Sequence, residues 1–492
     1  MNHILAIDQS TSTTKALLFD PLGHLIDQSS AEHRQIYPRP GWVEHDPEEI
    51  YTNTLKAIRI LLEHNSAYRD HLQYLSITNQ RETIVVFERG SGRPLYNAIV
   101  WQCRRGASLC EELTQAGYTD LIHRRTGLKI DTYFSASKIR WLVENDPQIA
   151  RRLRNGEALL GTIDTYLIYR LTNGQVHASD TTNASRTLLY DIENLCWDEE
   201  LCDLFHTPLQ ALPQVYESRS YYGQTNLEGL LEQPIPISGV MGDSQASLFA
   251  QRCFNPGSAK VTFGTGSSLL LNIGSKIKYS KNGIVSTIAW VDLGHPTYAF
   301  EGLINFSAAT ISWLKNQIKL INSAAETEEL ARSVEDNGGV YLVPAFVGLS
   351  APYWQPEARA AIIGMTPFTD RNHIVRAALE SIAYQVKDVL ELMVAEAEIP
   401  LQYIHGDGGA ARNGFLMQFV ADMIRYPVRI PEFAELSALG AVYCGLLGTG
   451  QINSLEELNA LPREFHQFTP MMVEEQVQKL YAGWKAAVRR VL

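Results

Sequence analysis

Residues 4–20 read ILAIDQSTSTTKALLFD, and residues 258–274, about half the chain away, read SAKVTFGTGSSLLLNIG. Each stretch is a short apolar run, a loop of small hydroxyl or Gly residues, and a second apolar run, which is typical of a strand, a turn and a second strand. Such loops leave backbone N–H groups and hydroxyls free to bind anions. The repetition predicts two related lobes that grip one polyphosphate, although two ordinary hairpins would show the same pattern.

The bulk composition is that of an ordinary soluble globular protein, and the charge favours an enzyme over a nucleic-acid-binding or membrane-surface protein. Of 492 residues, 45% are hydrophobic and 20% are charged, as in ordinary globular domains, and the length predicts two or three domains. The formal charge of −12 disfavours non-specific nucleic-acid binding. We expect no signal peptide and no membrane-spanning helix. Six cysteines without a CxxC pair fit reduced thiols in the cytoplasm.

Strand-like runs alternate with amphipathic helical patterns along the chain, which predicts an α/β fold. Residues 235–241 (IPISGVM) read as a strand that leads into a helix. The best boundary lies near residues 245–257, which divides the chain into an N-terminal lobe, 1–250, and a C-terminal lobe, 251–492. Helical candidates are residues 47–64, 134–154, 302–319, 373–396 and 412–425.

The first candidate site is the loop that runs from Asp8 to Lys15. Four consecutive hydroxyl residues, Thr11 to Thr14, and the cationic Lys15 could surround phosphate oxygens. Asp8, at the end of a buried strand, could hold Mg²⁺, since hard cations take oxygen ligands. A polar turn with a solvated lysine explains the same residues.

The second candidate is the adjacent pair Arg81 and Glu82, which lies between two predicted strands. The pair supplies hydrogen-bond donors and acceptors together, and each hydroxyl of a polyol needs both. A surface ion pair is the alternative interpretation.

The third candidate is Gly242-Asp243-Ser244-Gln245-Ala246, after an apolar strand. Asp243 could be a general base that takes a proton from an attacking hydroxyl. The segment is also close to the GxSxG nucleophile elbow, which would make Ser244 a hydrolase nucleophile. Either residue could simply cap the next helix.

The fourth candidate is Gly406-Asp407-Gly408-Gly409-Ala410-Ala411, between a predicted strand and a predicted helix. It partly matches the dinucleotide-binding fingerprint, but that fingerprint belongs near the start of a Rossmann domain. A nucleotide that lies on a helix N-terminus fits this position better. No GxxxxGK[ST] sequence occurs, which excludes a P-loop, and no Cys/His cluster suggests zinc.

Together these segments resemble the FGGY carbohydrate kinases, and the glycerol kinase branch most closely. The resemblance runs through nearly the whole chain and includes two long family signatures, one from Tyr133 to Asn145 and one from Ala360 to Glu380. Further matching stretches are RQIYPRPGWVEHDPEEIY (34–51), SITNQRET (76–83), IVWQCRR (99–105), IPISGVMGD (235–243), GLSAPYWQPEARAAIIGMT (348–366) and ALGAVY (438–443).

The resemblance implies an actin-like ATPase (ribonuclease H-like) duplicated two-lobe fold with a central cleft. It also implies transfer of the γ-phosphoryl group of MgATP to a hydroxyl of a small polyol or ketose. The carried-over roles are a metal site at Asp8 and Asp243, with Asp243 also the catalytic base; nucleotide contacts at Thr11, Ser12, Thr13, Lys15, Gly264, Thr265, Gly266, Gly409 and Asn413; and acceptor contacts at Arg81, Glu82, Trp101, Tyr133, Asp243 and Ser244.

Departures from the glycerol kinase pattern concern the acceptor most. Ser244 replaces a Gln that usually follows the catalytic Asp, and Ser268 replaces an aromatic residue that packs on glycerol. Both changes enlarge and polarise the pocket, so we expect a four- or five-carbon polyol or ketose. Lys15 stands where arginine is usual, which keeps the charge and loses the planar fork. Pro234 replaces an arginine of allosterically inhibited relatives.

Ala308 and Ser312 replace a Gly and a Gln near the nucleotide, which is a further departure from the family pattern. The alternatives to an altered kinase are glycerol kinase proper, a non-catalytic actin-like sugar-binding regulator, and a serine hydrolase. The expected partner is a small polyol or sugar, without nucleic acid or membrane, and the expected assembly is a homodimer or a homotetramer.

Overall fold

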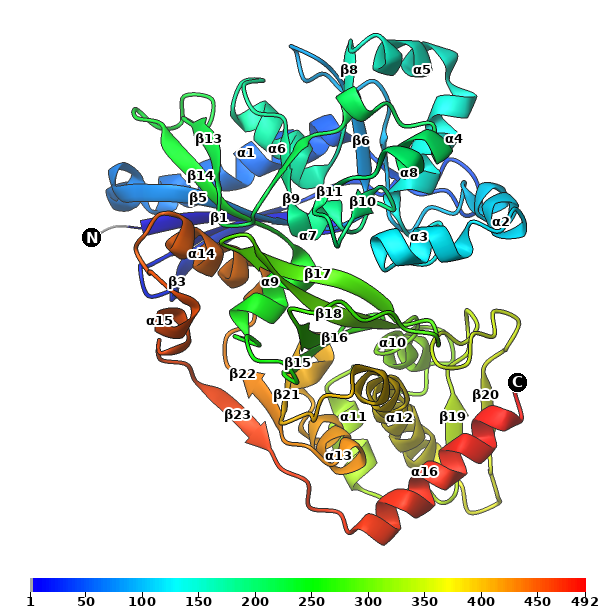
Figure 1. The fold of residues 1–492 in the computed structure, drawn as a ribbon. Helices are drawn as coiled ribbons and strands as arrows, with labels where there is room; N and C mark the ends of the chain where they lie inside the picture. The colour runs from blue at the N-terminus through cyan, green and yellow to red at the C-terminus, as the bar shows by residue number, and fades with distance from the viewer. Residues whose placement is uncertain (1–2) are drawn as a thin grey trace.

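The computed structural model describes residues 3–492, which form two halves around two main sheets (Figure 1). The first sheet has the order β13-β14-β5-β1-β2-β3 and the second β17-β18-β16-β15-β21-β22-β23. The first sheet consists of β1 (His3–Gln9), β2 (Thr13–Phe19), β3 (Leu25–Glu32), β5 (Leu72–Asn79), β13 (Tyr221–Thr225) and β14 (Ile235–Gly242). The second consists of β15 (Ala259–Phe263), β16 (Ser267–Gly274), β17 (Val285–Asp292), β18 (His295–Ile304), β21 (Ile404–Asp407), β22 (Val428–Pro431) and β23 (Phe465–Phe468).

The two sheets repeat one topology. In the first, β1, β2 and β3 form an antiparallel meander, and β5 and β14 extend it in parallel on the β1 side. In the second, β15, β16 and β18 are antiparallel neighbours in the matching places, with β17 inserted in the chain before β18 and paired on its outer side, and β21 and β22 extend the sheet in parallel on the β15 side. The predicted duplicated fold is therefore confirmed, and both quoted stretches are antiparallel hairpins.

The remaining elements surround these sheets. The helices are α1 (Pro47–His64), α2 (Ala107–Gln115), α3 (Thr119–Thr126), α4 (Ser135–Asn145), α5 (Pro147–Arg154), α6 (Ile163–Leu171), α7 (Thr181–Ala184), α8 (Glu199–Leu204), α9 (Asp243–Ala250), α10 (Ala309–Asn316), α11 (Glu326–Arg332), α12 (Arg371–Ala397), α13 (Gly414–Ile424), α14 (Leu436–Gly448), α15 (Leu455–Asn459) and α16 (Glu474–Arg489), with 3-10 helices at Ser66–His71, Leu209–Ala211 and Gly409–Arg412. A smaller sheet joins β4 (Glu44–His45), β7 (Ala98–Ile99), β6 (Ile84–Glu88) and β8 (Ala158–Thr162), and short pairs join β9 (Ala178–Asp180) to β12 (Gln214–Tyr216), β10 (Tyr190–Asp191) to β11 (Cys196–Trp197), and β19 (Tyr341–Val343) to β20 (Ala361–Ile363).

Two helix predictions need correction. Residues 302–304 finish β18 instead of opening a helix, and α10 starts only at Ala309. They pair with β16 inside the sheet, where a β-carbon on Gly302 would lie 2.3 Å from Val389 of α12. Residues 134–154 form two helices, because Asp146 caps α5 and Pro147 occupies its first turn, a position that suits proline.

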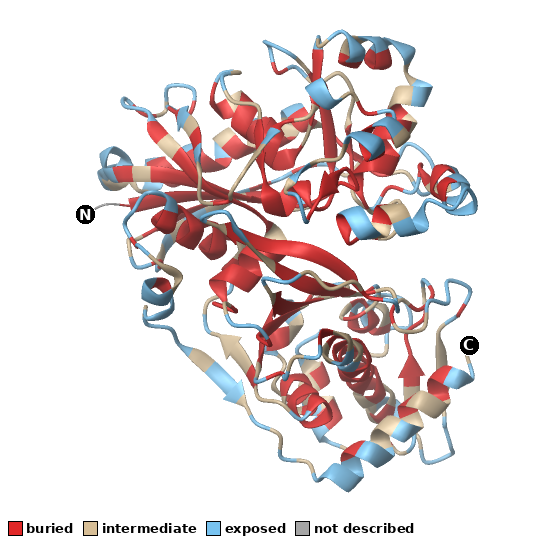
Figure 2. Ribbon diagram, in the orientation of Figure 1, coloured by how far each residue is buried: buried red, intermediate tan, exposed pale blue. Residues whose placement is uncertain are grey.

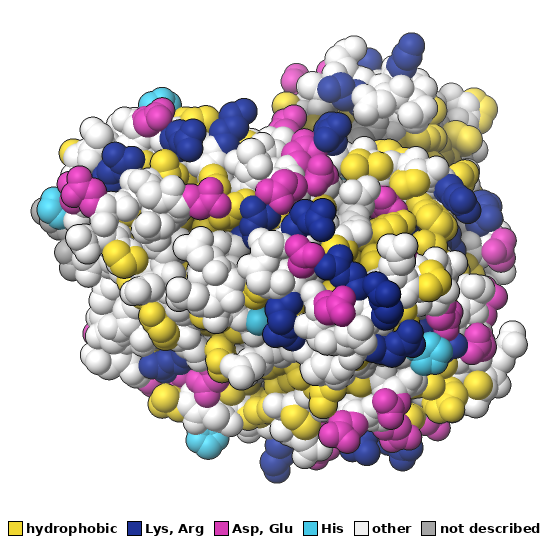
Figure 3. All heavy atoms as spheres, turned by 90° about the horizontal axis from the view of Figure 1, so that it is seen from above, with side chains coloured by type: hydrophobic (Ala, Val, Ile, Leu, Met, Phe, Trp, Pro, Cys, Tyr) yellow, Lys and Arg dark blue, Asp and Glu magenta, His cyan; other side chains and the backbone are white. Residues whose placement is uncertain are grey.

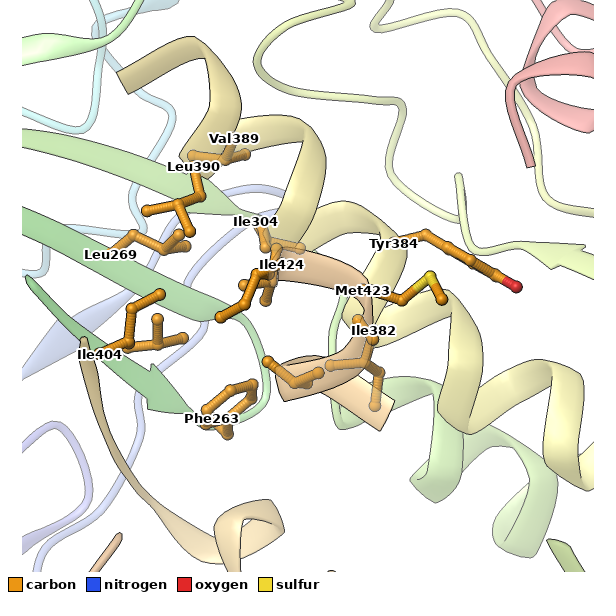
Figure 4. Close-up of a cluster of buried hydrophobic side chains, with 14 of the residues drawn as sticks. Phe263, Leu269, Ile304, Ile382, Tyr384, Val389, Leu390, Ile404, Met423 and Ile424 are labelled. Atoms are coloured by element: carbon orange, nitrogen blue, oxygen red, sulfur yellow. The ribbon is translucent and has the colours of Figure 1, made fainter. Parts of the chain in front are cut away.

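Apolar side chains pack on both sides of the sheets, and the central strands of both are buried, whereas the edge strands β3 and β23 are largely intermediate or exposed (Figure 2). In the C-terminal half, Phe263, Leu269 and Ile404 of the sheet pack toward Ile382 and other apolar side chains of α12 and α13 (Figure 4). Each fully buried large apolar side chain contributes roughly 1.5–3 kcal/mol relative to exposure. This core holds β15 and β16, and hence their connecting loop, in place.

Helix α14 comes from the C-terminal half of the chain but lies against the first sheet (Figure 1). Its carbonyl at Val442 accepts a hydrogen bond of 2.9 Å from the Tyr74 hydroxyl of β5. It crosses α9 so closely that a β-carbon on Gly440 would lie 1.9 Å from the carbonyl oxygen of Ala246. This crossing places the start of α14 beside the end of β14.

The surface and the cysteines agree with the composition. The face in Figure 3 carries Lys and Arg side chains close to Asp and Glu side chains, and Arg170 pairs with Glu48 at 2.6 Å in the N-terminal half. All six cysteines are free, as the missing CxxC pair predicts. Within residues 3–492, no helix combines the length and the apolar character needed to span a membrane.

Candidate active site

A cleft of about 780 Å³ lies where the two hairpin loops and the start of α14 meet. Residues that the sequence predicted and that line the cleft are Asp8, Thr11, Ser12, Arg81, Glu82, Trp101, Tyr133, Asp243, Ser244, Thr265 and Gly266. Predicted residues outside its lining are Thr13, Lys15, Gly264, Gly409 and Asn413.

The first hairpin loop is a tight turn, in which the Ser10 amide donates to the Thr13 carbonyl at 2.9 Å. The Thr11 carbonyl accepts hydrogen bonds of 2.8 Å from the side chains of His33 and Gln35. These bonds hold the loop with Ser12 exposed. The hydroxyl of Thr14 is buried without a partner in the interior, so Thr14 cannot meet phosphate as the hydroxyl pattern suggested.

Lys15 lies at the cleft edge and pairs with Glu435, which precedes α14. Next to this pair, burial raises the pKa of the Asp8 carboxyl to about 7, with smaller raising effects from the carboxylates of Asp243 and Glu435 and a lowering effect from Lys15. Neighbouring carboxylates destabilise each other's charged form, and a hard cation, which prefers oxygen ligands, would relieve that repulsion. Within residues 3–492, no group of three or more His, Cys, Asp or Glu could hold a metal alone, so phosphate oxygens or water must complete any such site.

Asp243 is the first residue of α9 and directly follows β14, which ends at the cleft. Its side chain remains 41% exposed, and one carboxylate oxygen lies 3.2 Å from Nε of Arg81. A β-carbon on Gly242 would lie 2.7 Å from Cγ of Arg81. Glycine at this position therefore leaves room for the side chain of Arg81. A carboxylate oriented in this way can accept a proton from a hydroxyl in the cleft.

Two aromatic side chains form one wall of the same part of the cleft. Trp101 and Tyr133 meet edge to face with ring centroids 5.3 Å apart, and the indole N–H of Trp101 donates to the Thr11 hydroxyl at 3.1 Å. The buried amine of Lys138 donates to the carbonyls of Thr132, Tyr133 and Phe134, each at 2.8 Å. Those bonds hold the backbone that carries Tyr133.

The guanidinium of Arg81 donates to Glu301 at 2.8 Å and to Gln245 at 3.1 Å. Burial raises the pKa of Glu301, but the charges of Arg186 and Arg81 outweigh burial and hold this pKa at about 2. For Glu82, burial outweighs the same two arginines and raises the pKa. Glu301 is therefore the firmly ionised partner of Arg81.

Ser244 and Ser268, the two departures from the glycerol kinase pattern, contact each other at 3.1 Å between their hydroxyls. The amine of Lys260 donates to Ser244 and to Thr262, both at 2.8 Å. Lys260 is buried, and burial lowers the pKa of its amine. The wall beside Asp243 is thus polar.

The second hairpin loop, Gly264 to Gly266, is closed by a hydrogen bond of 3.0 Å from the Gly264 amide to the Gly266 carbonyl. The Thr265 carbonyl accepts from the amides of Ser307 and Ala309, which fixes the loop to the start of α10. A β-carbon on Gly266 would lie 2.5 Å from the Ile304 carbonyl, so the close approach requires glycine. Thr265 and Gly266 face the cleft.

Gly409 and Asn413 are the residues expected to contact the adenosine part of the nucleotide. Gly408, with φ +90°, lines the cleft, and Gly409 opens the following 3-10 helix with free space where a β-carbon would stand. Asn413 caps α13 by accepting from the Leu416 amide at 2.9 Å and donates to Thr327. Its amide therefore has a structural role already, and its contact with adenosine stays a prediction.

Sequence reasoning did not single out Lys260, which lines the cleft, or Arg186 and Glu301, which contact Glu82 and Arg81 from outside the lining. Glu301 interrupts the apolar run YAFEGLI, and Lys260 stands inside the apolar start of the second hairpin. A charge at a strand position that should be buried was the available signal. Arg186 lies in a polar stretch and shows no such signal.

Comparison with known proteins agrees with this geometry. The family model described as the N-terminal domain of the FGGY family of carbohydrate kinases matches residues 3–250, and the model for the C-terminal domain of the same family matches residues 259–449. The chain belongs to the FGGY family of carbohydrate kinases. It is therefore a phosphotransferase that uses an alcohol group as acceptor, with ATP as the expected donor substrate of the family.

Similar proteins cover the whole length of this carbohydrate kinase. Glycerol kinase 1 of Thermotoga maritima is 48% identical over 490 residues, which cover 100% of this chain and 99% of the relative. A glycerol kinase of Desulfitobacterium hafniense is 47% identical with the same coverage. The crystal structure of Plasmodium falciparum glycerol kinase with ADP has a TM-score of 0.95 and 38% identity, covering 100% of this chain and 98% of that one.

Proposed function

We propose that this kinase transfers the γ-phosphoryl group of MgATP to a hydroxyl of a polyol or ketose with four or five carbons. The observation that carries the acceptor size is the polar contact of Ser244, Ser268 and Lys260 beside Asp243. Short hydroxyl side chains leave room there, and their donors and acceptors suit a further hydroxyl of the substrate.

In the proposed reaction, Asp243 is the general base. Its carboxylate takes the proton of the acceptor hydroxyl, whose oxygen bonds to the γ-phosphorus, and the bond to the β–γ bridging oxygen breaks to release ADP. Arg81, Glu82, Trp101 and Tyr133 hold the acceptor. Orientation and charge neutralisation supply most of the catalysis in this reaction class.

The two hairpin loops are the proposed phosphate contacts, with Thr11, Ser12, Thr13 and Lys15 on one side and Gly264, Thr265 and Gly266 on the other. Gly409 and Asn413 mark the proposed adenosine end. Asp8 and Asp243 would hold Mg²⁺, which when bound supplies positive charge to the phosphate oxygens. The carboxylates of Asp243 and Glu435 add to the effect of burial in raising the pKa of Asp8, and a cation would offset their mutual repulsion.

Glycerol is the reference acceptor, because similar proteins over the full length are named glycerol kinases. The test is a coupled assay of ADP release over polyols and ketoses with three to six carbons. We expect the highest kcat/KM for a four- or five-carbon acceptor, whereas glycerol as the best acceptor would show glycerol kinase proper. Stimulation by none of them would favour a binding-only regulator.

A matched double variant tests the cause of the acceptor preference. Ser244→Gln with Ser268→Phe restores the side chains typical of the glycerol kinase branch. We expect its kcat/KM ratio of glycerol to the best larger acceptor to rise about ten- to hundredfold, as for one lost hydrogen-bonding contact and altered packing. An unchanged ratio would mean that these two serines do not set acceptor size.

A further inference from the structure

Four charged side chains form a closed ring beneath the acceptor part of the cleft. Arg81 contacts Glu301 at 2.8 Å, Glu301 contacts Arg186 at 2.5 Å, and Arg186 contacts Glu82 at 2.7 Å. Nε of Arg81 lies 3.8 Å from Glu82 and closes the ring. The side chains of Arg186 and Glu301 have no exposure to solvent. Two positive and two negative charges thus balance inside the protein.

The ring supports the two side chains proposed to bind the acceptor hydroxyls. Glu82 has φ +63°, a backbone conformation that residues other than Gly rarely adopt. Arg186 donates a hydrogen bond to the carboxylate of Glu82. Arg81 reaches Asp243 with Nε while one terminal nitrogen is held by Glu301. Buried charges of this kind are costly unless each is paired, so the partners define one geometry.

The ring also joins the two sheets. Arg81 and Glu82 follow β5 of the first sheet, whereas Glu301 belongs to β18 of the second. Two residues beyond Glu301, Leu303 faces the cleft. A displacement of β18 would therefore move Glu301 and shift the Arg81 side chain that it holds, which in turn contacts Asp243.

We propose that Arg186 and Glu301 are positioning residues for acceptor binding: Arg186 orients the Glu82 carboxylate, and Glu301 orients the Arg81 guanidinium from the opposite sheet. This inference rests on the proposed function, since it assigns Arg81 and Glu82 to the acceptor. Neither residue lines the cleft, so neither contacts substrate. The ring couples the second sheet to acceptor affinity.

The test uses Glu301→Gln, Glu301→Asp and Arg186→Lys in the full chain, with separate KM values for acceptor and ATP. We expect Glu301→Gln and Arg186→Lys to raise the acceptor KM about ten- to hundredfold, the range for loss of one charged hydrogen bond. The ATP KM should change less than about twofold, because the ion pairs of the four ring side chains within residues 3–492 lie outside the two hairpin loops. Glu301→Asp should recover part of the loss by restoring the charge.

Glu380→Gln is the matched control. Glu380 is equally buried and pairs with Arg376 at 2.8 Å within α12, outside the cleft lining. It should lower the urea midpoint and leave both KM values unchanged. Equal changes in acceptor and ATP KM, or the same acceptor effect from Glu380→Gln, would overturn the positioning role. Should Glu301→Gln not fold, Arg186→Lys decides by the same criteria. An unmodified enzyme without activity on any acceptor would instead refute the proposed function, and the inference with it.

Discussion

The amine of Lys15 lies 2.9 and 2.7 Å from the two carboxylate oxygens of Glu435, a residue 420 positions later in the chain. The pair links β2 of the first hairpin to the start of α14, across the edge of the cleft. The carboxylate of Glu435 therefore partly offsets the positive charge that Lys15 places beside the first loop. Four groups of predictions follow from this pair and from other contacts around the cleft.

The first concerns nucleotide affinity. Lys15→Met should raise the ATP KM about tenfold, since it removes one charged hydrogen bond to phosphate, and should leave the acceptor KM nearly unchanged. Because both side chains are partly exposed, the pair contributes only about 0.2–1 kcal/mol to the free energy of unfolding. Steady-state kinetics and urea unfolding measure the two effects. Lys15→Arg is the control that keeps the charge, and an acceptor KM that rises as much as the ATP KM would contradict the assignment.

The second concerns pH and magnesium. With the pKa of Asp8 at about 7, the carboxyl is neutral below that pH and binds a cation poorly. The apparent KM for Mg²⁺, measured at fixed ATP, should fall as pH rises from 6 to 8. Glu435→Gln removes a carboxylate that raises this pKa, so its profile should move to lower pH. Coincident profiles for the two proteins would rule out this electrostatic coupling.

The same carboxyl affects stability with a defined sign. Its pKa rises from 3.8 to about 7 on folding, so between these values the folded chain holds a proton that the unfolded chain has lost. Stability from this group is therefore present at low pH and declines as pH rises toward 7. Asp8→Asn should remove this decline from urea unfolding measured across the window.

The third concerns the general base. Asp243→Asn should lower kcat by about 10²–10⁴-fold, with far smaller changes in the ATP KM. Ser244→Ala should act mainly on the acceptor KM, because its hydroxyl contacts Ser268 and Lys260. Coupled ADP release measures both variants. A larger loss of kcat in Ser244→Ala than in Asp243→Asn would favour the nucleophile-elbow interpretation.

The fourth concerns the crossing of α9 and α14. Gly440→Ala should lower the free energy of unfolding by about 1–3 kcal/mol through overpacking, because the new methyl group would lie 1.9 Å from the Ala246 carbonyl. On helix propensity alone the same change would stabilise by about 1 kcal/mol, so the sign is diagnostic. Gly409→Ala adds a methyl group where nothing lies within 4 Å and serves as the control in urea unfolding. A stabilised Gly440→Ala variant would contradict the close crossing.

Residues 4–20 and 258–274 by themselves predicted two hairpins, because alternation of apolar runs and small-residue loops is a local signal. The local sequence pattern predicted the wrong structure at residues 302–304, which form the end of a strand inside the sheet and not the start of a helix. Apolar residues in a short run fit both structures, and only pairing with β16 separates them. Asp243 could be predicted as a cleft residue because an apolar strand, a glycine and a carboxylate follow one another in the sequence.

The sequence alone determined the fold class and the phosphotransferase family and predicted a part of the cleft lining, since these depend on local patterns and spaced motifs. Only the tertiary structure decided that Lys15 pairs with Glu435, that Thr14 is buried, and that Arg186 and Glu301 support Arg81 and Glu82. The physical reason is that a buried ion pair is set by where two sheets and a returning helix pack, and such contacts join residues whose separation along the chain carries no pattern.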